Sequence, residues 1–142
     1  MNNAQNARVP KIGDVYMAMF DGDDSEQTGL RPALIFQNNV GNRHSPNVIV
    51  LPLTSKVKKK YLPTHVIVPA NGTGLDRTSM VLCENPMSIS KNKLGAYCTT
   101  LPSEYMGKIA EAHLLATSAI SFVDPAVMAS IWEKASKLNS VT

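Results

Sequence analysis

The stretch GDVYMAMFDGDDSEQTGLRPALIFQNN, residues 13–39, decides the fold of this 142-residue chain. Its first part, Asp14 to Phe20, mixes β-branched, aromatic and other apolar residues and predicts a strand. Its last part, Pro32 to Gln37, is a nearly continuous apolar run, which is typical of a strand buried on both faces. The polar, Gly-containing stretch between them, Asp21 to Gly29, predicts a loop. The domain therefore opens with two strands that a polar loop joins.

Three further strands are predicted downstream, at Val48–Leu53 (VIVLPL), His65–Val68 (HVIV) and Ser79–Cys83 (SMVLC). Pro52 predicts a bulge or a sheet edge in the first of them, because proline has no backbone donor for a ladder. The runs are short and apolar, as expected of a small closed or strongly coiled sheet. We expect a barrel of five to six strands.

The last third of the chain changes from strand to helix periodicity. Ser103 is predicted to be the N-cap of a first helix, and Asp124 followed by Pro125 predicts a second helix start. In the first helix one face is expected to hold Met106, Ile109, Ala110, His113, Leu114 and Thr117. Residues 103–138 are thus expected to be helical and to pack outside the barrel, which gives an α+β fold.

Length and composition indicate one domain over residues 1–142, with the Asn-rich start, residues 1–10, expected to be flexible. No apolar run approaches the roughly 20 residues that span a bilayer, and the start lacks the apolar segment of a secretory signal. We therefore expect a cytoplasmic protein without a membrane partner. Cys83 and Cys98 are expected to stay thiols there, and no Cys/His spacing of metal-ligand type occurs.

The charge is unevenly distributed along the chain. Residues 31–93 carry nine Lys and Arg but only Asp76 and Glu84, whereas residues 1–30 carry five acids and two bases. A basic middle suits a polyanion, because each phosphate contact by Lys or Arg releases condensed counterions. A solvated surface explains the same pattern equally well. Lys56, Lys58, Lys59, Lys60 and Tyr61 form a candidate stripe for a nucleic-acid backbone with one stacking ring, or else a solvated hairpin.

Four segments in order resemble the MazF/PemK (Kid) family of toxins from type II toxin–antitoxin systems. They are residues 13–39, SPNVIVLPLTSK at 45–56, LPTHVIV at 62–68 and LDRTSMVLCEN at 75–85. Four ordered segments are far more specific than one short motif. The sequence departs from the family pattern at Asn85, Pro86 and Met87, where the family often has Gln, an apolar residue and Arg.

The resemblance implies a small SH3-like or CcdB-like barrel, mostly antiparallel, and a two-fold homodimer. It also implies a sequence-specific endoribonuclease that cuts single-stranded RNA, such as mRNA, without a metal or other cofactor. A small antitoxin with an acidic, disordered tail would neutralise it, and DNA would be bound only through the antitoxin complex. The family's catalytic pair, an Arg at the start of the second strand and a Thr at the end of the third, falls on Arg31 and Thr54.

Arg31 has a guanidinium suited to bidentate contact with phosphate oxygens, and the Thr54 hydroxyl suits donation to one of them. The general base remains unassigned, because an Arg side chain stays protonated. The other residues expected to bind RNA are Ser25, Glu26, Gln27, Lys56, His65, Glu84 and Asn85. Residue identity alone favours plainer roles, a surface ion pair for Arg31 and an ordinary strand residue for Thr54.

Two rival functions share these features. A gyrase-binding toxin of the CcdB type would have the same barrel but no chemistry, and Arg31 and Thr54 speak against it. A non-catalytic RNA- or DNA-binding regulatory module would need only the basic middle of the chain.

Overall fold

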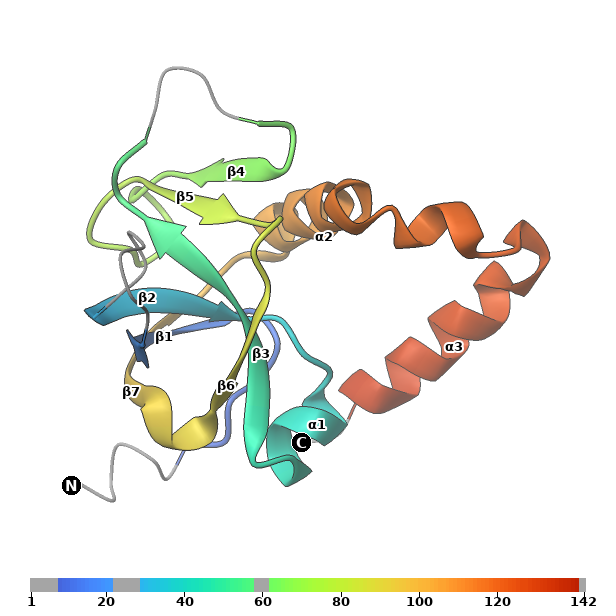
Figure 1. The fold of residues 1–142 in the computed structure, drawn as a ribbon, viewed down its shortest axis with the longest axis horizontal. Helices are drawn as coiled ribbons and strands as arrows, with labels where there is room; N and C mark the ends of the chain where they lie inside the picture. Colours follow the sequence, from blue (N-terminus) through green and yellow to red (C-terminus); the bar gives the residue numbers. More distant parts are fainter. Residues whose placement is uncertain (1–7, 22–28, 58–61, 141–142) are drawn as a thin grey trace.

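The computed structural model describes residues 8–21, 29–57 and 62–140. It is an antiparallel sheet flanked by helices (Figure 1). The strands are β1 (Asp14–Phe20), β2 (Gly29–Ile35), β3 (Asn47–Thr54), β4 (His65–Val68), β5 (Ser79–Leu82), β6 (Met87–Ser90) and β7 (Leu94–Thr100). The helices are α1 (Asn39–His44), α2 (Ser103–Thr117) and α3 (Met128–Asn139), with 3-10 turns η2 (Lys91–Lys93), η3 (Ala119–Phe122) and η4 (Pro125–Val127).

The sheet has the strand order β4-β5-β3-β2-β1-β7, and β6 pairs with β3 off this path. The predicted α+β class is confirmed, and the seven strands exceed the five to six that were predicted. The two additional strands are β6 and β7, for which the local sequence pattern gave no signal. All the strand pairs of this sheet are antiparallel.

Strand β3 changes partners along its length. On one side residues 47–50 pair with β6 and residues 53–54 pair with β5, while residues 50–52 pair with β2 on the other side. Pro52 falls between the segments that pair with β6 and β5, where a missing N–H costs no ladder bond. The predicted bulge or edge at Pro52 is therefore a change of partner in a central strand.

Two apolar cores lie on the two faces of this sheet. One core includes Leu34, Leu51 and Leu53 together with Ile109 and Ala112 of α2. The other, which β1, β2, β3 and the start of β7 enclose, includes Tyr16, Ala33, Ile35, Val48 and Val50. Neighbouring residues of one strand enter different cores because strand side chains alternate. This double burial explains the apolar runs in the sequence.

Helix α2 covers the first core and lies against β4 (Figure 1). Its predicted start was wrong by one residue: Ser103 begins the helix and Pro102 precedes it as the N-cap, with no side-chain cap bond. Ile109 is buried as predicted, but Ala110 and Leu114 are exposed and Ala112 is buried instead. The buried face is thus turned by about one position, and its buried or half-buried residues are Tyr105, Met106, Ile109, Ala112, His113 and Ala116.

The second predicted helix start is confirmed at Asp124, whose side chain accepts a hydrogen bond of 2.9 Å from the Ala126 N–H. The turn that follows is 3-10, and α3 begins at Met128. In Figure 1, α3 lies apart from the sheet and approaches the body of the molecule only at α1. The expectation that the C-terminal helices pack on the barrel thus holds for α2 but not for most of α3. None of the described helices is long and apolar enough to cross a membrane.

A buried carboxylate fixes the start of the chain to the sheet. Asp14 is 1% exposed and accepts hydrogen bonds from Thr100 Oγ1 at 2.7 Å, from the Lys11 N–H at 3.0 Å and from Arg8 at 3.3 Å. Arg8 also lies over the Tyr97 ring, 4.0 Å from its centroid. Residues 8–10, which were predicted to be flexible, are therefore tied to β1 and β7.

Candidate functional site

The two residues predicted to be catalytic lie where β2 and β3 separate. Arg31 is half-buried near the start of β2, and Thr54 ends β3 opposite Met80. The ladder between β2 and β3 ends at the pair Ala33–Pro52, and its register continued by two residues aligns Arg31 with Thr54. Aligned residues of antiparallel strands project from the same face. The continued register thus places both residues on the same side of the sheet, two residues beyond the last pair of the ladder.

His65 belongs to the same face as Thr54. Val66, Val81 and Leu53 form one row across β4, β5 and β3 and enter the core beside α2. Since side chains alternate along a strand, His65 and Thr54 project from the opposite face. In a regular sheet the two residues lie two strands apart and are offset by two residues along the strand, which places their Cα atoms roughly 12 Å apart. That span suits neighbouring groups of one RNA strand rather than a single reacting atom.

His65 is held by two hydrogen bonds. Its Nδ1 accepts from the Leu62 N–H at 3.1 Å, and its Nε2 lies 2.8 Å from Glu84 Oε2. With Nδ1 an acceptor, the ring proton lies on Nε2 and is donated to Glu84. The Thr64 hydroxyl adds a long contact of 3.5 Å to the same carboxylate. The structure thus joins two predicted RNA-binding residues into a pair, and His65 has no free ring nitrogen with which to accept the proton of a 2′-hydroxyl.

Thr54 and Lys56 are linked through the backbone. The Lys56 N–H donates to Thr54 Oγ1 at 3.1 Å, and the Lys56 side chain is exposed. A hydroxyl that accepts through a lone pair keeps its own proton for donation. The remainder of the basic stripe, Lys58 to Tyr61, lies outside the described residues.

The other predicted RNA-binding residues are divided between two places. Ser25, Glu26 and Gln27 fall in residues 22–28, which lie outside the described part of the chain. Asn85 is half-buried at the turn after β5, where its N–H donates to the Leu82 carbonyl at 3.1 Å. Glu84, with its side chain 35% exposed, is next to Asn85 on that turn.

A pocket of about 570 Å³ opens beside Arg31. Its wall includes Met17, Leu30, Leu53, Ser55, Asp76 and Arg77. The volume lies in the range of sites that hold small molecules, and apolar walls with a few polar groups are typical of them. Asp76 and Arg77 were not among the predicted site residues, because residues 71–76 were interpreted only as a turn. The available signal was an acidic and a basic residue, Asp76 and Arg77, at the end of that Gly-rich turn.

The loop that carries Asp76 and Arg77 is fixed against β7. Gly74 has φ +80°, and a Cβ there would lie 2.9 Å from the Thr99 Cβ, so only glycine fits. Thr99 Oγ1 donates to the Thr73 carbonyl at 2.8 Å. The contacts of Gly74 and Thr73 with Thr99, rather than a helix or strand, thus hold this pocket-lining loop in place.

The cysteines differ in environment. Cys83 is fully buried, and burial raises the pKa of its thiol to about 12. Cys98 is exposed and borders the pocket, and partial burial also raises its pKa. Within residues 8–21, 29–57 and 62–140, no group of three His, Cys, Asp or Glu is placed to hold a metal ion.

A seven-stranded antiparallel sheet with short helices around it, and with an arginine and a threonine near the ends of its neighbouring strands β2 and β3, defines a small α+β protein. The sequence model of the PemK-like, MazF-like toxins of type II toxin–antitoxin systems matches residues 11–115. The chain belongs to this family.

Two relatives illustrate the likeness. The chain is 41% identical over 115 residues to "Endoribonuclease EndoA" of Bacillus subtilis, which covers 80% of this chain and 99% of that protein. It is 39% identical over 101 residues to "Endoribonuclease MazF" of Staphylococcus saprophyticus, which covers 70% of this chain and 84% of that protein.

Solved structures share the fold. The Mycobacterium tuberculosis toxin MazF-mt6 is 31% identical with a TM-score of 0.63, covering 74% of this chain and 96% of that one. A mycobacterial endoribonuclease in complex with its cognate antitoxin is 29% identical with a TM-score of 0.64, covering 78% and 96%. MazF of Deinococcus radiodurans, at 22% identity and a TM-score of 0.67 with coverage of 78% and 98%, shows the same fold.

Proposed function

We propose that this chain is a toxin that cleaves single-stranded RNA, including mRNA, at a short sequence. The observation that supports the proposal is the register of β2 and β3, which, continued two residues beyond its last pair, Ala33–Pro52, would set Arg31 opposite Thr54 on one face of the sheet. The names of the relatives, endoribonucleases EndoA and MazF, support the same reaction.

RNA supplies its own nucleophile. The 2′-oxygen attacks the neighbouring phosphorus, the bond from phosphorus to the 5′-oxygen breaks, and a 2′,3′-cyclic phosphate and a 5′-hydroxyl result. The 2′-hydroxyl loses a proton and the leaving 5′-oxygen gains one. The enzyme therefore has to stabilise the negative charge that develops on the phosphorane and to hold the phosphate in line.

Arg31 is assigned to the developing charge. A guanidinium offers donors in a planar fork that matches two phosphate oxygens, and it stays protonated at any physiological pH. It also has a proton to share with the leaving oxygen. Its position at the rim, half-buried and beside the pocket, keeps it within reach of a strand that follows the sheet face.

Thr54 is assigned to orientation. Since its oxygen accepts from the Lys56 N–H, the hydroxyl proton points elsewhere and is available for a phosphate oxygen. Neither residue is a suitable base, and both nitrogens of His65 are occupied. We assign His65 and Glu84 to the RNA-binding rim, and the base to none of the described residues.

The RNA strand is expected to run from the Arg31–Thr54 rim toward His65, Glu84 and Asn85. Bases unstacked from a single strand fit a partly apolar pocket with an acid and a base, because Asp76 can accept from an amino group and Arg77 can bind phosphate. Ser25, Glu26 and Gln27 remain predicted base contacts from the loop before β2.

Partners and setting follow from the family. We propose that a cognate antitoxin occludes this face, because a mycobacterial endoribonuclease of the same fold forms a complex with its own cognate antitoxin. We also propose that the toxin acts as a homodimer in the cytoplasm. DNA would be bound only through the antitoxin complex.

Cleavage of a long natural transcript in the presence of EDTA tests the proposal. We expect fragments whose 5′ ends accept labelled phosphate directly from a kinase, since they carry hydroxyls. Arg31→Ala and Thr54→Ala should abolish the cuts, whereas Arg43→Ala, on α1 beyond the other end of β2, should keep them. Replacing the 2′-hydroxyl at a mapped cut with hydrogen should protect that site alone.

The outcome also separates the rival functions. Binding of RNA without any cut would favour a regulatory module, and binding of neither RNA nor its fragments would favour a gyrase-binding toxin. Cuts that disappear in EDTA would refute the metal-independent reaction.

A further inference from the structure

The pocket beside Arg31 lies behind the sheet face from which Arg31 projects. Arg31 pairs with Ala18, whose side chain belongs to the core away from α2, and paired residues of antiparallel strands project the same way. Met17 and Pro32 form the neighbouring pair and therefore project toward the α2 side, as Leu53 of the core beside α2 does. Met17, Pro32 and Leu53 all line the pocket. Arg31 thus borders a compartment that opens on the opposite side of its own strand.

Two charged side chains of the pocket have no partner among the described residues. Asp76 and Arg77 are exposed and line the pocket, and no hydrogen bond or ion pair within the described part of the chain occupies the carboxylate or the guanidinium. The Asp76 carboxylate lies near β7, where burial and the charge of Asp76 both raise the pKa of the Cys98 thiol. The pocket therefore combines apolar walls with one free acceptor group and one free donor group.

A carboxylate discriminates between the four bases of RNA. It accepts hydrogen bonds and donates none. Adenine, cytosine and guanine each carry an exocyclic amino group whose N–H bonds can be donated to it. Uracil carries no amino group, and its one imide N–H lies between two carbonyl oxygens that repel a carboxylate. Such a repulsive contact is an effective source of specificity, because it penalises the wrong partner directly.

We propose that Asp76 selects one base of the RNA site by requiring an exocyclic amino group and excluding uracil. The inference rests on the proposed function, since the base belongs to the RNA strand whose phosphate Arg31 contacts. In this assignment the apolar side chains that line the pocket contact the ring of the base, Asp76 accepts from its amino group, and Arg77 contacts a phosphate of the strand. The volume of about 570 Å³ lies within the range of small-molecule sites and accommodates one base.

Mapping of cut ends on a long natural transcript tests the assignment. The aligned cuts of the wild-type chain should contain at least one position at which uracil is absent. At one such position Asp76→Asn should admit uracil, because an amide offers an acceptor for the imide N–H and a donor for the neighbouring carbonyl oxygen. On oligonucleotides that differ only there, the wild-type kcat/KM should be roughly tenfold or more lower with uracil, and the variant should remove most of this difference.

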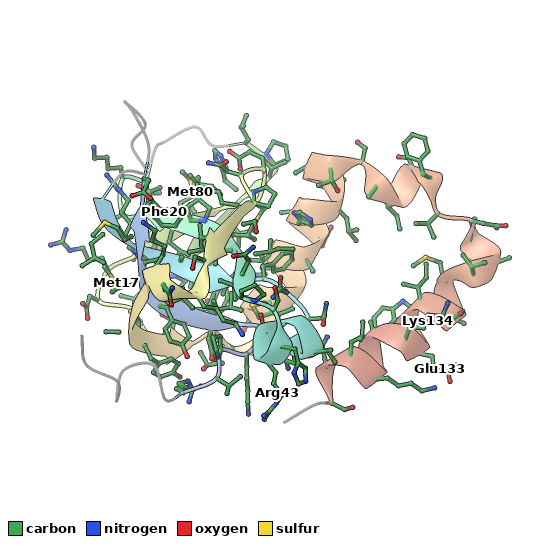
Figure 2. The ribbon with its side chains drawn as sticks, turned by 60° about the horizontal axis from the view of Figure 1, so that its bottom comes forward. Met17, Phe20, Arg43, Met80, Glu133 and Lys134 are labelled. Atoms are coloured by element: carbon green, nitrogen blue, oxygen red, sulfur yellow. The ribbon has the colours of Figure 1, made fainter. Side chains whose placement is uncertain are left out.

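A gain of new cut sites separates specificity from damage, since a misfolded variant only loses activity. Glu133→Gln is the matched control, because it also converts an exposed carboxylate to an amide and should leave the recognised sequence unchanged. Figure 2 shows Glu133 on α3, on the opposite side of the molecule from Met17 of the pocket. Arg77→Gln should lower cleavage at all sites alike without admitting uracil, because a phosphate contact carries no sequence information.

The outcomes distinguish this assignment from the proposed function. Cuts that tolerate uracil at every position, or an unchanged recognition sequence in Asp76→Asn, would overturn the assignment while RNA cleavage itself stands. A wild-type chain that cuts no RNA would overturn the proposed function instead. Equilibrium binding of labelled oligocytidylate and oligouridylate then decides the role of Asp76. Tighter wild-type binding of oligocytidylate that is lost in Asp76→Asn supports the assignment, and equal binding of the two overturns it.

Discussion

Replacement of Ile109 by alanine tests how α2 is held. Ile109 is fully buried in the core that α2 shares with β3, β4 and β5. The substitution removes three carbon groups at about 0.8 kcal/mol each and adds the cost of the cavity they leave. We expect the free energy of unfolding to fall by about 3 kcal/mol, a large share of the 5–15 kcal/mol typical of a domain.

Leu115→Ala is the matched control on the same helix. Leu115 is 58% exposed, so its truncation should cost less than about 1 kcal/mol. Urea unfolding should be followed by far-UV circular dichroism at one fixed protein concentration, because association shifts apparent stability. The single tryptophan is unsuitable, since Trp132 lies on α3 and reports that region instead.

The outcome discriminates between two packings of α2. A loss below about 1 kcal/mol for Ile109→Ala would mean that the helix does not close this core. A loss at Leu115 equal to that at Ile109 would mean that the exposed side of α2 is covered by something else. Either result would refute the assignment of the buried helix face.

Three further predictions concern the site and the thiols. Gly74→Ala should lower RNA cleavage and destabilise the fold by roughly 1–3 kcal/mol, because the added Cβ meets Thr99 and the backbone at this position is left-handed. Cleavage and urea unfolding assays run in parallel would detect both effects. No effect in either assay would count against a fixed pocket loop. A thiol reagent should titrate only the exposed Cys98 in the native chain at pH 8 and both cysteines in urea, whereas rapid native labelling of Cys83 would contradict its burial. Burial raises the pKa of Cys83 and of Tyr16 to about 12, above the pKa values of these groups in the unfolded chain. The free energy of unfolding should therefore be at its full value below about pH 9 and fall between about pH 9 and 12, by on the order of 1 kcal/mol per pH unit per group. A urea midpoint that stays constant over that range would contradict this prediction.

The sequence predicted the five strands that are richest in buried apolar residues, β1 to β5. Runs such as Val48–Leu53 follow from strands that supply two cores, so hydrophobicity alone marks them. It did not predict β7, because this strand is largely exposed, contains Gly95 and polar residues, and pairs with β1 through register shifts. Its pairing depends on contacts far away in the sequence, which no local pattern contains.

The site was predicted in part for a similar reason. Arg31 and Thr54 were identified by resemblance, and the β2–β3 register, from which their alignment is inferred, is a property of the folded sheet. The pairing of His65 with Glu84 joins residues 19 apart and could not be derived from either neighbourhood. Asp76 and Arg77 line the same pocket as Arg31, and the loop that carries them packs through Gly74 against Thr99, a contact between distant segments.

The change of partners along β3 has a consequence for how the molecule opens. The same strand supplies Val48 and Val50 to one core and Leu51 and Leu53 to the other. Neither core can therefore unfold by releasing β3 while the other core remains folded. Hydrogen exchange should therefore find its slowest backbone amides along β3, at the rate of global unfolding. Helix α3, in which no residue is buried, should exchange many times faster, as a separate unit of local unfolding.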